Sequence, residues 1–387
     1  MERPVNMRGS MKIAMVYARF MNSDGQDRSV GGIQTYLFNL GQVCSKHHHE
    51  PIIYQAASRP FKSQVGPISV VGVPVSNPGK HTKQLVEAAA SAIDLKKDLL
   101  IFGADRYAMD IGTNRCISIQ HGIEWDLLAK YGHPTSRLRR IVGDSIYQVI
   151  RRRRAIKAYL QCPNRVCVDY NFLNWLRTFL VSELPGRDWV ILNSADIAPE
   201  KVVSAKEKNK ESIEILFARR FHVYRGTRIM AEAAKRLLAK HGNIEFTFAG
   251  EGPDETWLKN YFSSENRVQF IKYKPEQSLD VHLQHDIAVI PSLASEGSSL
   301  SVSEAMGAGC AVVATAVGGI TNMIINGYNG FLCIPTANDL EKQIEILIAD
   351  DNKRLLMGTR AYDTAKEALS LDKWEESWAQ VIEEVTE

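Results

Sequence analysis

Long apolar runs are absent from this chain of 387 residues. No stretch reaches the roughly 18–20 consecutive apolar residues that a membrane-spanning helix needs. The first residues also lack an extended apolar segment ahead of a cleavage site, which argues against a secretion signal. The sequence therefore predicts a cytoplasmic protein without a transmembrane helix.

Closely spaced cysteine pairs are absent as well, so the usual signature of a structural zinc site is missing. The six cysteines are dispersed and mostly sit in apolar surroundings. We therefore expect reduced, buried thiols rather than disulfides. Three histidines at positions 47–49 have no further ligand nearby, which favours a solvated loop over a metal site.

Two motifs of nucleotide chemistry are also missing. The turn at residues 250–253 contains a proline and lacks the third glycine of the dinucleotide-binding fingerprint, which disfavours a pyridine-nucleotide oxidoreductase. No Asp-x-Asp occurs anywhere in the chain, so a carboxylate clamp for a divalent metal has no obvious ligand pair. The sequence predicts a site that uses neither a metal nor a cofactor.

The length of the chain exceeds the size at which one hydrophobic core usually stops growing, so we expect two domains. A hydrophobic content of 45% and a charged content of 24% are ordinary for globular proteins. The net charge of +3 is unevenly distributed, because residues 134–177 contain ten Lys or Arg and two Asp. This segment is expected to lie near an anionic partner.

The basic segment also has helical periodicity. Between Arg137 and Lys157, aliphatic residues recur at spacings of three and four, with arginines around them. Such a segment can lie on an anionic membrane surface, and it can equally be the solvated face of a helix. No zinc-finger or RNA-binding motif accompanies it, so nucleic acid is not an expected partner.

Short apolar strands alternate with amphipathic helices along both halves of the chain, which is typical of α/β sheets. A strand at residues 12–18 leads through a polar loop into a helix that starts at Gly31 and Gly32. The second half opens with a strand at residues 213–218. Near the end, an apolar stripe from residue 371 to 385 indicates a helix that packs on a large apolar surface.

Residues 291–332 contain the strongest functional signal. Glu296 and Glu304 are separated by seven residues, and Ser301-x-x-Glu304 has the spacing of a capping box. This predicts Glu304 in the first turn of a helix and Glu296 on the preceding loop, both facing one hollow. A helix N-terminus attracts phosphate and carboxylates accept bonds from hydroxyls, so the pattern indicates a nucleotide sugar. Taken singly, each glutamate could equally be a helix cap or a solvated loop residue.

The same stretch resembles the E-x7-E signature of the retaining glycosyltransferases of family 4, with the family's EAM-x-x-G-x-x-V-V-A and Gly-Gly sequel. One departure is the pair Ser298-Ser299, where the family often has an aromatic residue and a glycine. The resemblance implies the GT-B fold, in which two Rossmann-like, doubly wound α/β domains face each other across a cleft. It implies an acceptor-binding domain at 1–193, a nucleotide-sugar-binding domain at 194–370, and a helix at 371–387 that returns to the first domain.

The resemblance also implies roles for individual residues. His121 follows an expected strand and would contact the transferred sugar or the acceptor, while Glu296 would hold the donor sugar; these two are the expected catalytic residues. Arg225 stands where the family has a lysine, and its guanidinium is suited to a diphosphate. The expected donor-binding residues are Gly31, Gly32, Arg220, Arg225, Ser299, Leu300 and Glu304.

The predicted function is retaining, metal-independent transfer of a hexose-type sugar from a nucleotide-diphosphate sugar to a saccharide or lipid-linked saccharide. Such a reaction fits cell-envelope polysaccharide synthesis by a cytoplasmic protein that associates peripherally with the inner face of the membrane. One alternative is a non-catalytic GT-B-like protein that binds a saccharide or a membrane. The other is an NAD(P)-dependent oxidoreductase. The donor sugar, the base, the acceptor, the linkage and the oligomeric state stay open.

Overall fold

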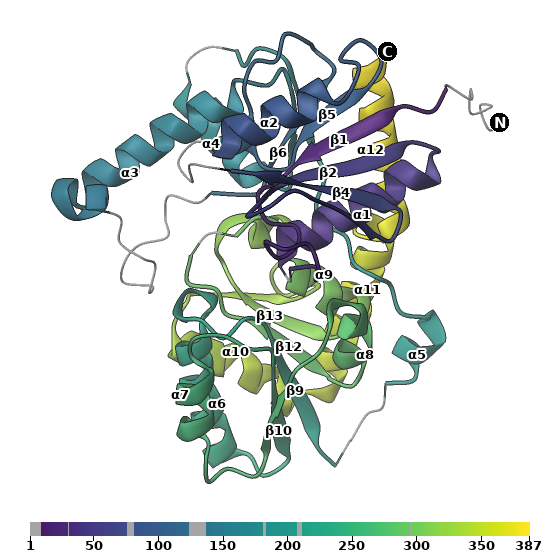
Figure 1. Cartoon of the computed structure of the whole chain (residues 1–387). Helices are drawn as coiled ribbons and strands as arrows, with labels where there is room; N and C mark the ends of the chain where they lie inside the picture. Colours follow the sequence, from purple (N-terminus) through teal and green to yellow (C-terminus); the bar gives the residue numbers. More distant parts are fainter. Residues whose placement is uncertain are drawn as a thin grey trace.

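The computed structural model describes residues 9–29, 31–75, 81–123, 137–180, 183–206, 211–294 and 296–387. The strands of this part form two separate sheets, each packed against helices, and the two sheets belong to two domains joined end to end (Figure 1). The two doubly wound sheets that the sequence predicts are therefore present.

The N-terminal sheet has the strand order β3-β4-β2-β1-β5-β6-β7-β8 in the described residues. All neighbours are parallel except β3 and β4, which form an antiparallel pair. Its strands are β1 (Lys12–Val16), β2 (Glu50–Ala57), β3 (Phe61–Val65), β4 (Ile68–Pro74), β5 (Leu99–Phe102), β6 (Cys116–Gln120), β7 (Asn164–Cys167) and β8 (Arg187–Val190). The accompanying helices are α1 (Gly32–Lys46), α2 (His81–Ser91), η1 (Asp105–Tyr107), α3 (Arg137–Tyr159) and α4 (Tyr170–Phe179).

The C-terminal sheet is parallel throughout, in the order β11-β10-β9-β12-β13-β14. Its strands are β9 (Ile213–Ala218), β10 (Ile244–Ala249), β11 (Val268–Ile271), β12 (Ile287–Ile290), β13 (Ala311–Thr315) and β14 (Phe331–Cys333). The helices are α5 (Glu200–Ser204), η3 (Val223–Arg225), α6 (Thr227–Lys240), α7 (Glu255–Tyr261), η4 (Pro275–Gln277), α8 (Ser278–Leu283), α9 (Leu300–Gly307), η5 (Gly318–Asn322), α10 (Ala337–Ala349) and α11 (Asp351–Ala368).

The central strands are rich in apolar residues because helices cover both of their faces. β5, β6, β12 and β13 are buried along their whole length. In both sheets the chain winds outward in two directions from a central pair, which is β1 and β5 in the first sheet and β9 and β12 in the second. Ligands of open α/β sheets bind beyond the carboxyl ends of such a pair, which directs attention to the loops that follow these four strands.

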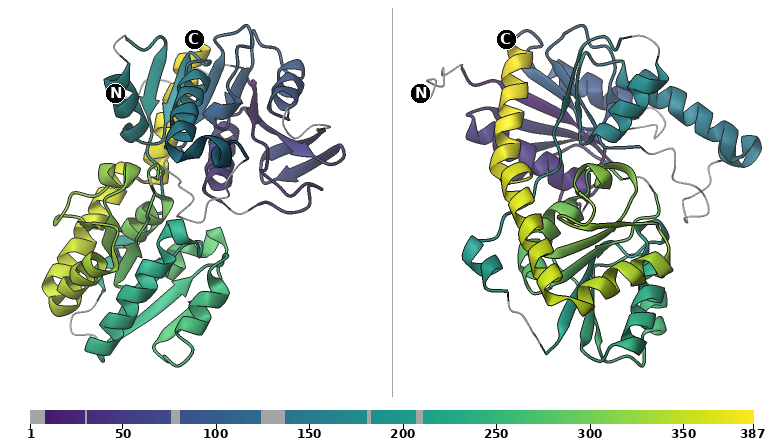
Figure 2. Two further views of the ribbon diagram at one scale, coloured as in Figure 1. Left: turned by 90° about the vertical axis from the view of Figure 1, so that its left-hand side faces the viewer. Right: turned by 180° about the vertical axis from the view of Figure 1, so that it is seen from behind.

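The last helix, α12 (Leu371–Thr386), continues from α11 and lies against the N-terminal domain (Figure 2). Its buried side chains, Trp374 and Trp378 among them, belong to the N-terminal core. The indole Nε1 of Trp378 donates to the Tyr36 hydroxyl at 3.0 Å, and the Arg115 guanidinium donates to the Thr386 carbonyl at 2.6 Å. The terminal helix is thus held by both packing and hydrogen bonds on the first domain.

One local prediction is wrong. Helix α9 begins at Leu300 with Ser299 as its N-cap residue, so Ser301 and Glu304 form no capping box. The Ser301 hydroxyl instead donates to the Ala218 carbonyl at 3.3 Å. Glu304 consequently lies in the second turn of α9 rather than in the first.

The state of the cysteines matches the prediction from the composition. All six cysteines are buried and free, as the dispersed pattern predicts. Among the described helices, none combines the length and the apolar character that crossing a membrane requires.

Candidate active site

Two neighbouring strands of the C-terminal sheet deliver the charged residues of the candidate site. Arg219 follows the end of β9, and Glu296 lies on the loop between β12 and α9. Since β9 and β12 are adjacent and parallel, both positions fall on the same edge of the sheet. Arg225 ends η3, and Gly226 after it has a φ of 81°, a left-handed conformation that glycine tolerates.

The carboxylate of Glu296 is surrounded by donors. Its Oε1 accepts from Arg219 Nη2 at 2.5 Å, from Arg225 Nη1 and from the Ser292 hydroxyl. Arg219 also donates through Nη1 to the Ser292 hydroxyl at 2.6 Å. The side chains of Arg219 and Glu296 are almost fully buried, whereas that of Arg225 is 34% exposed. The accessible cation is therefore Arg225, whose guanidinium lies over the Tyr224 ring at 5.1 Å.

The two glutamates of the motif differ in electrostatics. Burial raises the pKa of Glu296, but the charges of Arg219 and Arg225 outweigh burial and bring that pKa down to about 2. Burial raises the pKa of Glu304 to about 7, with the Ser278 hydroxyl acting in the opposite direction and Asp196 adding to the rise. At neutral pH, Glu296 is ionised and Glu304 is near its titration midpoint.

Of the two adjacent arginines after β9, Arg219 points into the site while Arg220 is exposed. Sequence reasoning singled out Arg220 together with Arg225 and missed Arg219. The role expected for Arg220 stays a prediction. The role of Arg219 as a partner of Glu296 had one signal in the sequence, namely its position directly at the end of a buried strand.

His121 is placed on the opposite side, at the end of β6 in the N-terminal domain. Its Nε2 is 2.9 Å from the Gly103 carbonyl, which can only accept, so Nε2 carries the proton and Nδ1 is left as an acceptor. Burial lowers the pKa of His121 to about 4, so the ring is neutral at pH 7. The ring also packs edge-on against Tyr36, with centroids 5.2 Å apart.

Close backbone contacts join the two domains at this place. A Cβ on Gly122 would lie 2.7 Å from the Gly297 nitrogen, so the residue after His121 touches the residue after Glu296. A Cβ on Gly32 would lie 3.5 Å from Cδ1 of Leu300, which brings the start of α1 against the start of α9. The structure therefore brings His121, Gly32, Glu296 and Leu300 into one region.

Further contacts across the boundary involve Asn193 and Asp169. The Asn193 backbone N–H donates to the Ser298 hydroxyl at 2.8 Å, and its side-chain amide donates to the Ser298 carbonyl at 2.5 Å. Asp169 caps α4 through Asn171 N–H at 2.6 Å and packs against Gly319. Burial raises the pKa of Asp169 to about 6. Sequence reasoning gave neither Asp169 nor Asn193 a role in the site.

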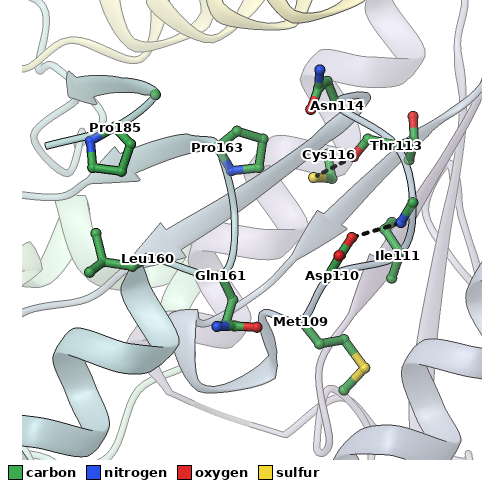
Figure 3. A pocket seen from close by; sticks show the side chains of 12 residues that line it. Met109, Asp110, Ile111, Thr113, Asn114, Cys116, Leu160, Gln161, Pro163 and Pro185 are labelled. Carbon is green, nitrogen blue, oxygen red and sulfur yellow. Dashed lines mark hydrogen bonds between the residues drawn. The ribbon is translucent and has the colours of Figure 1, made fainter.

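A pocket of about 400 Å³ lies at a different edge of the N-terminal sheet, where β6, β7 and β8 begin (Figure 3). Its lining includes Asp110, Cys116, Gln161 and Pro185, and it contains no residue that the sequence motifs single out. The candidate site therefore rests on the ion pairs and loop contacts at the carboxyl ends of the strands. Within the described ranges, no group of three or more His, Cys, Asp or Glu side chains is arranged to hold a metal ion.

Residues 199–364 match the model of the family described as "Glycosyl transferases group 1". This range includes Arg219, Arg225, Glu296 and Glu304, and thus all the charged residues of the cluster. The family match therefore covers the C-terminal domain, in which the E-x7-E motif lies.

Curated relatives match over similar stretches. The amylovoran biosynthesis glycosyltransferase AmsK of Erwinia amylovora is 29% identical over 146 residues, which cover 35% of this chain and 36% of AmsK. The lipopolysaccharide 1,2-N-acetylglucosaminetransferase of Salmonella typhimurium is 24% identical over 190 residues, 46% of this chain and 48% of that protein. The chain thus spans less than half the length of these two relatives.

Similarity to solved structures extends over nearly the whole chain. The structure of HepE from Anabaena in complex with UDP-glucose has a TM-score of 0.67, with 97% of this chain and 100% of that chain covered. The sequence identity is only 16%, so this comparison concerns the fold. The GT-B architecture expected from the sequence is confirmed for both domains.

Proposed function

Because residues 199–364 match the family model of glycosyl transferases group 1, and because its two domains have the GT-B fold, we propose that it is a glycosyltransferase. The proposed donor is a nucleotide-diphosphate sugar, transferred with retention of anomeric configuration and without a metal ion. The observation that carries the proposal is the cluster of Arg219 and Arg225 on Glu296, beside the N-terminus of α9.

The donor diphosphate is proposed to lie against Arg225, Arg220 and the N-terminus of α9 at Ser299 and Leu300. Guanidinium groups and free backbone N–H groups stabilise the charge that develops on the leaving diphosphate, which lowers the barrier. Arg225 is the mobile element in this proposal, because its side chain is 34% exposed and a diphosphate can draw it away from Glu296. Arg219 keeps Glu296 ionised throughout.

The sugar and the ribose are proposed to contact the two glutamates. Glu296, freed of Arg225, accepts bonds from hydroxyls of the donor sugar, and Glu304 accepts from the ribose hydroxyls. During transfer, the bond from the anomeric carbon to the diphosphate oxygen breaks and the acceptor oxygen bonds to the same face. The acceptor proton leaves with the diphosphate, and neutral His121 offers Nδ1 as an acceptor to another hydroxyl of the transferred sugar or of the acceptor, which helps to orient the reacting groups.

The acceptor is proposed to be a saccharide or a lipid-linked saccharide in cell-envelope polysaccharide synthesis. The names of the relatives support this class, since one acts in amylovoran biosynthesis and another on lipopolysaccharide. A lipid-linked acceptor requires a cytoplasmic enzyme to approach the inner face of the membrane, and the basic segment from Arg137 to Lys157 suits such a peripheral association.

A thermal-shift panel of UDP-, GDP-, ADP- and dTDP-sugars, with and without EDTA, tests the donor class. We expect one nucleotide sugar to raise the Tm by several degrees, equally in EDTA, and Glu304→Ala to lose this rise. Glu200→Ala is the matched control, because Glu200 is an exposed glutamate outside the site. A rise in Tm with NAD(P) alone would refute the proposal. No change in Tm with any nucleotide would favour a non-catalytic binding protein.

A further inference from the structure

Among the described residues, the apolar packing of helix α3 on the N-terminal domain lies near its C-terminal end. Around its C-terminal end, Ala155, Ile156 and Tyr159 belong to the apolar cluster shared with Phe172 and Leu176 of α4. The remainder of α3 extends away from the N-terminal domain (Figure 1). Its axis is broken at Gly143, whose φ of 75° is not helical.

The extended part of α3 exposes large aliphatic side chains. Ile141 is 73% exposed, Ile146 is 58% exposed and Val149 is 47% exposed. Ile146 and Val149 are three residues apart, which puts them on one face of the helix. Ile146 and Val149 therefore form an exposed apolar surface on the helix, and Ile141 adds an exposed side chain on the other side of the break at Gly143.

Basic side chains flank this apolar surface. Arg140, Arg153, Arg154 and Lys157 are exposed, and Arg153 follows Val149 by one helical turn. The acid on this helix, Asp144, is paired with Arg139 at 2.5 Å across the break at Gly143. The exposed charge of α3 is consequently positive, and it adjoins the aliphatic side chains.

The position of α3 connects this surface with the candidate site. α3 contacts η1, which begins two residues after Gly103. The Gly103 carbonyl holds the His121 ring. The attachment of α3 is therefore adjacent to the N-terminal side of the candidate site.

We propose that α3 docks the protein on an anionic lipid bilayer. Ile141, Ile146 and Val149 enter the boundary between headgroups and acyl chains, while Arg153 and its basic neighbours contact lipid phosphates. Charge complementarity selects anionic lipid, and the aliphatic side chains select a bilayer over a hydrophilic polyanion. This proposal names a partner for the proposed glycosyltransferase. Only the biological purpose of docking rests on that proposed function, because docking itself needs no catalysis.

Vesicle co-sedimentation of the full chain tests the proposal. We expect binding to phosphatidylcholine vesicles that contain about 30% phosphatidylglycerol, and little binding to pure phosphatidylcholine. Ile146→Glu should weaken the binding roughly tenfold or more, because it replaces inserted aliphatic groups with a charge. Ile334→Glu is the matched control, since Ile334 is 66% exposed and belongs to the C-terminal domain.

A second pair of variants separates charge from insertion. Arg153→Gln combined with Arg154→Gln should weaken binding to anionic vesicles and reduce its sensitivity to salt, because fewer charges are then screened. Equal binding to both vesicle types, or equal loss with Ile334→Glu, would overturn the proposal. So would a dimer in sedimentation velocity that Ile146→Glu dissolves, since α3 would then bind a second copy of this chain.

The outcomes for docking and for catalysis remain distinguishable. Ile146→Glu should keep the donor-induced rise in Tm, because Ile146 lies outside the donor site. If no nucleotide sugar binds while vesicles still do, the glycosyltransferase proposal fails and the docking proposal stands. If a donor binds and vesicles do not, the docking proposal fails alone.

Discussion

Glu296 and Glu304 carry the same functional group, and burial raises the pKa of both. Two nearby arginines reverse this effect only for Glu296, whose pKa falls to about 2. Glu304 has no direct arginine partner of this kind, and its pKa rises to about 7. Glu296 is therefore ionised at every pH near neutrality, whereas the ionised fraction of Glu304 changes with pH within the physiological range.

This difference predicts a pH dependence of donor binding. Below pH 7, Glu304 is mostly protonated and, in the proposed donor complex, would offer one acceptor fewer to the ribose hydroxyls. Binding of the nucleotide sugar should weaken about tenfold between pH 8 and pH 6, because the ionised fraction falls by that factor around a pKa of 7. Isothermal titration calorimetry at several pH values measures this directly. Glu304→Gln should bind more weakly and lose the pH dependence; a variant that keeps the slope would assign it to another group.

The ion pair of Arg219 and Glu296 predicts a stability effect. Glu296→Gln leaves the buried Arg219 guanidinium without its counter-charge, which should cost about 3 kcal/mol in urea unfolding at pH 7. The pKa of Glu296 is lower in the folded than in the unfolded chain, so its stabilisation is present above about pH 4.5 and is lost as the pH falls toward 2. The difference between wild type and variant should shrink over that range.

A double-mutant cycle assigns this loss to the pair. Arg219→Met combined with Glu296→Gln should be less destabilised than the sum of the two single variants, by at least about 1 kcal/mol. Additive losses would show that Arg219 and Glu296 stabilise the protein independently.

At the scale of elements, the sequence predicts the parts that are buried on both faces. The strand β9 has the predicted bounds, because a largely apolar run identifies it. The same burial removes the polar and apolar alternation that would show which way the residues after the strand point. Since the last four residues of β9 are all apolar and buried, they do not show whether Arg219 or Arg220 points into the site.

The start of α9 shows a second limit. Ser299 and Ser301 are both suitable N-cap residues, and the choice between them depends on tertiary contacts. The Ser301 hydroxyl is used by the Ala218 carbonyl of β9, and the Ser298 hydroxyl by Asn193 of the first domain. No local pattern contains these partners, so the helix begins earlier than the capping-box spacing predicts.

The turn that holds Arg225 predicts a strong effect of a small substitution. A Cβ on Gly226 would lie 1.8 Å from the Pro291 carbonyl oxygen, and φ at this position is 81°. Gly226→Ala should therefore destabilise the protein by about 3 kcal/mol or more and weaken donor binding, because η3 must move to relieve the clash.

Gly112→Ala is the control for this effect. Gly112 also has a positive φ, of 74°, but a Cβ there meets nothing within 4 Å. Its cost should stay near the roughly 1–2 kcal/mol of left-handed strain alone. Urea unfolding of both variants measures the difference, and equal losses would show that the contact with Pro291 adds nothing.

At the scale of the whole molecule, the site exists only because two domains meet. His121 and Gly32 belong to the first domain, whereas Glu296 and Leu300 belong to the second. The domains approach closely at Gly122, which lies against the Gly297 backbone, and at Gly32, which faces the Leu300 side chain. Sequence motifs identify the individual loops. Their approach depends on how the two sheets are joined, which the resemblance to the GT-B family implies and no local pattern specifies.

Helix α12 follows the C-terminal domain in sequence but packs into the N-terminal core, where the Trp378 indole is bonded to Tyr36. Trp378→Ala removes a fully buried aromatic ring and should cost about 3–5 kcal/mol. We expect the loss of protection in hydrogen exchange to fall on α12, β1 and α1, while β9 and β10 keep theirs. Tyr36 packs edge-on against His121, so acceptor-dependent turnover should fall more than donor binding does. Faster exchange in β9 and β10 alone would mean that α12 stabilises the C-terminal domain, and equal losses in both sheets would mean that the two domains unfold as one unit.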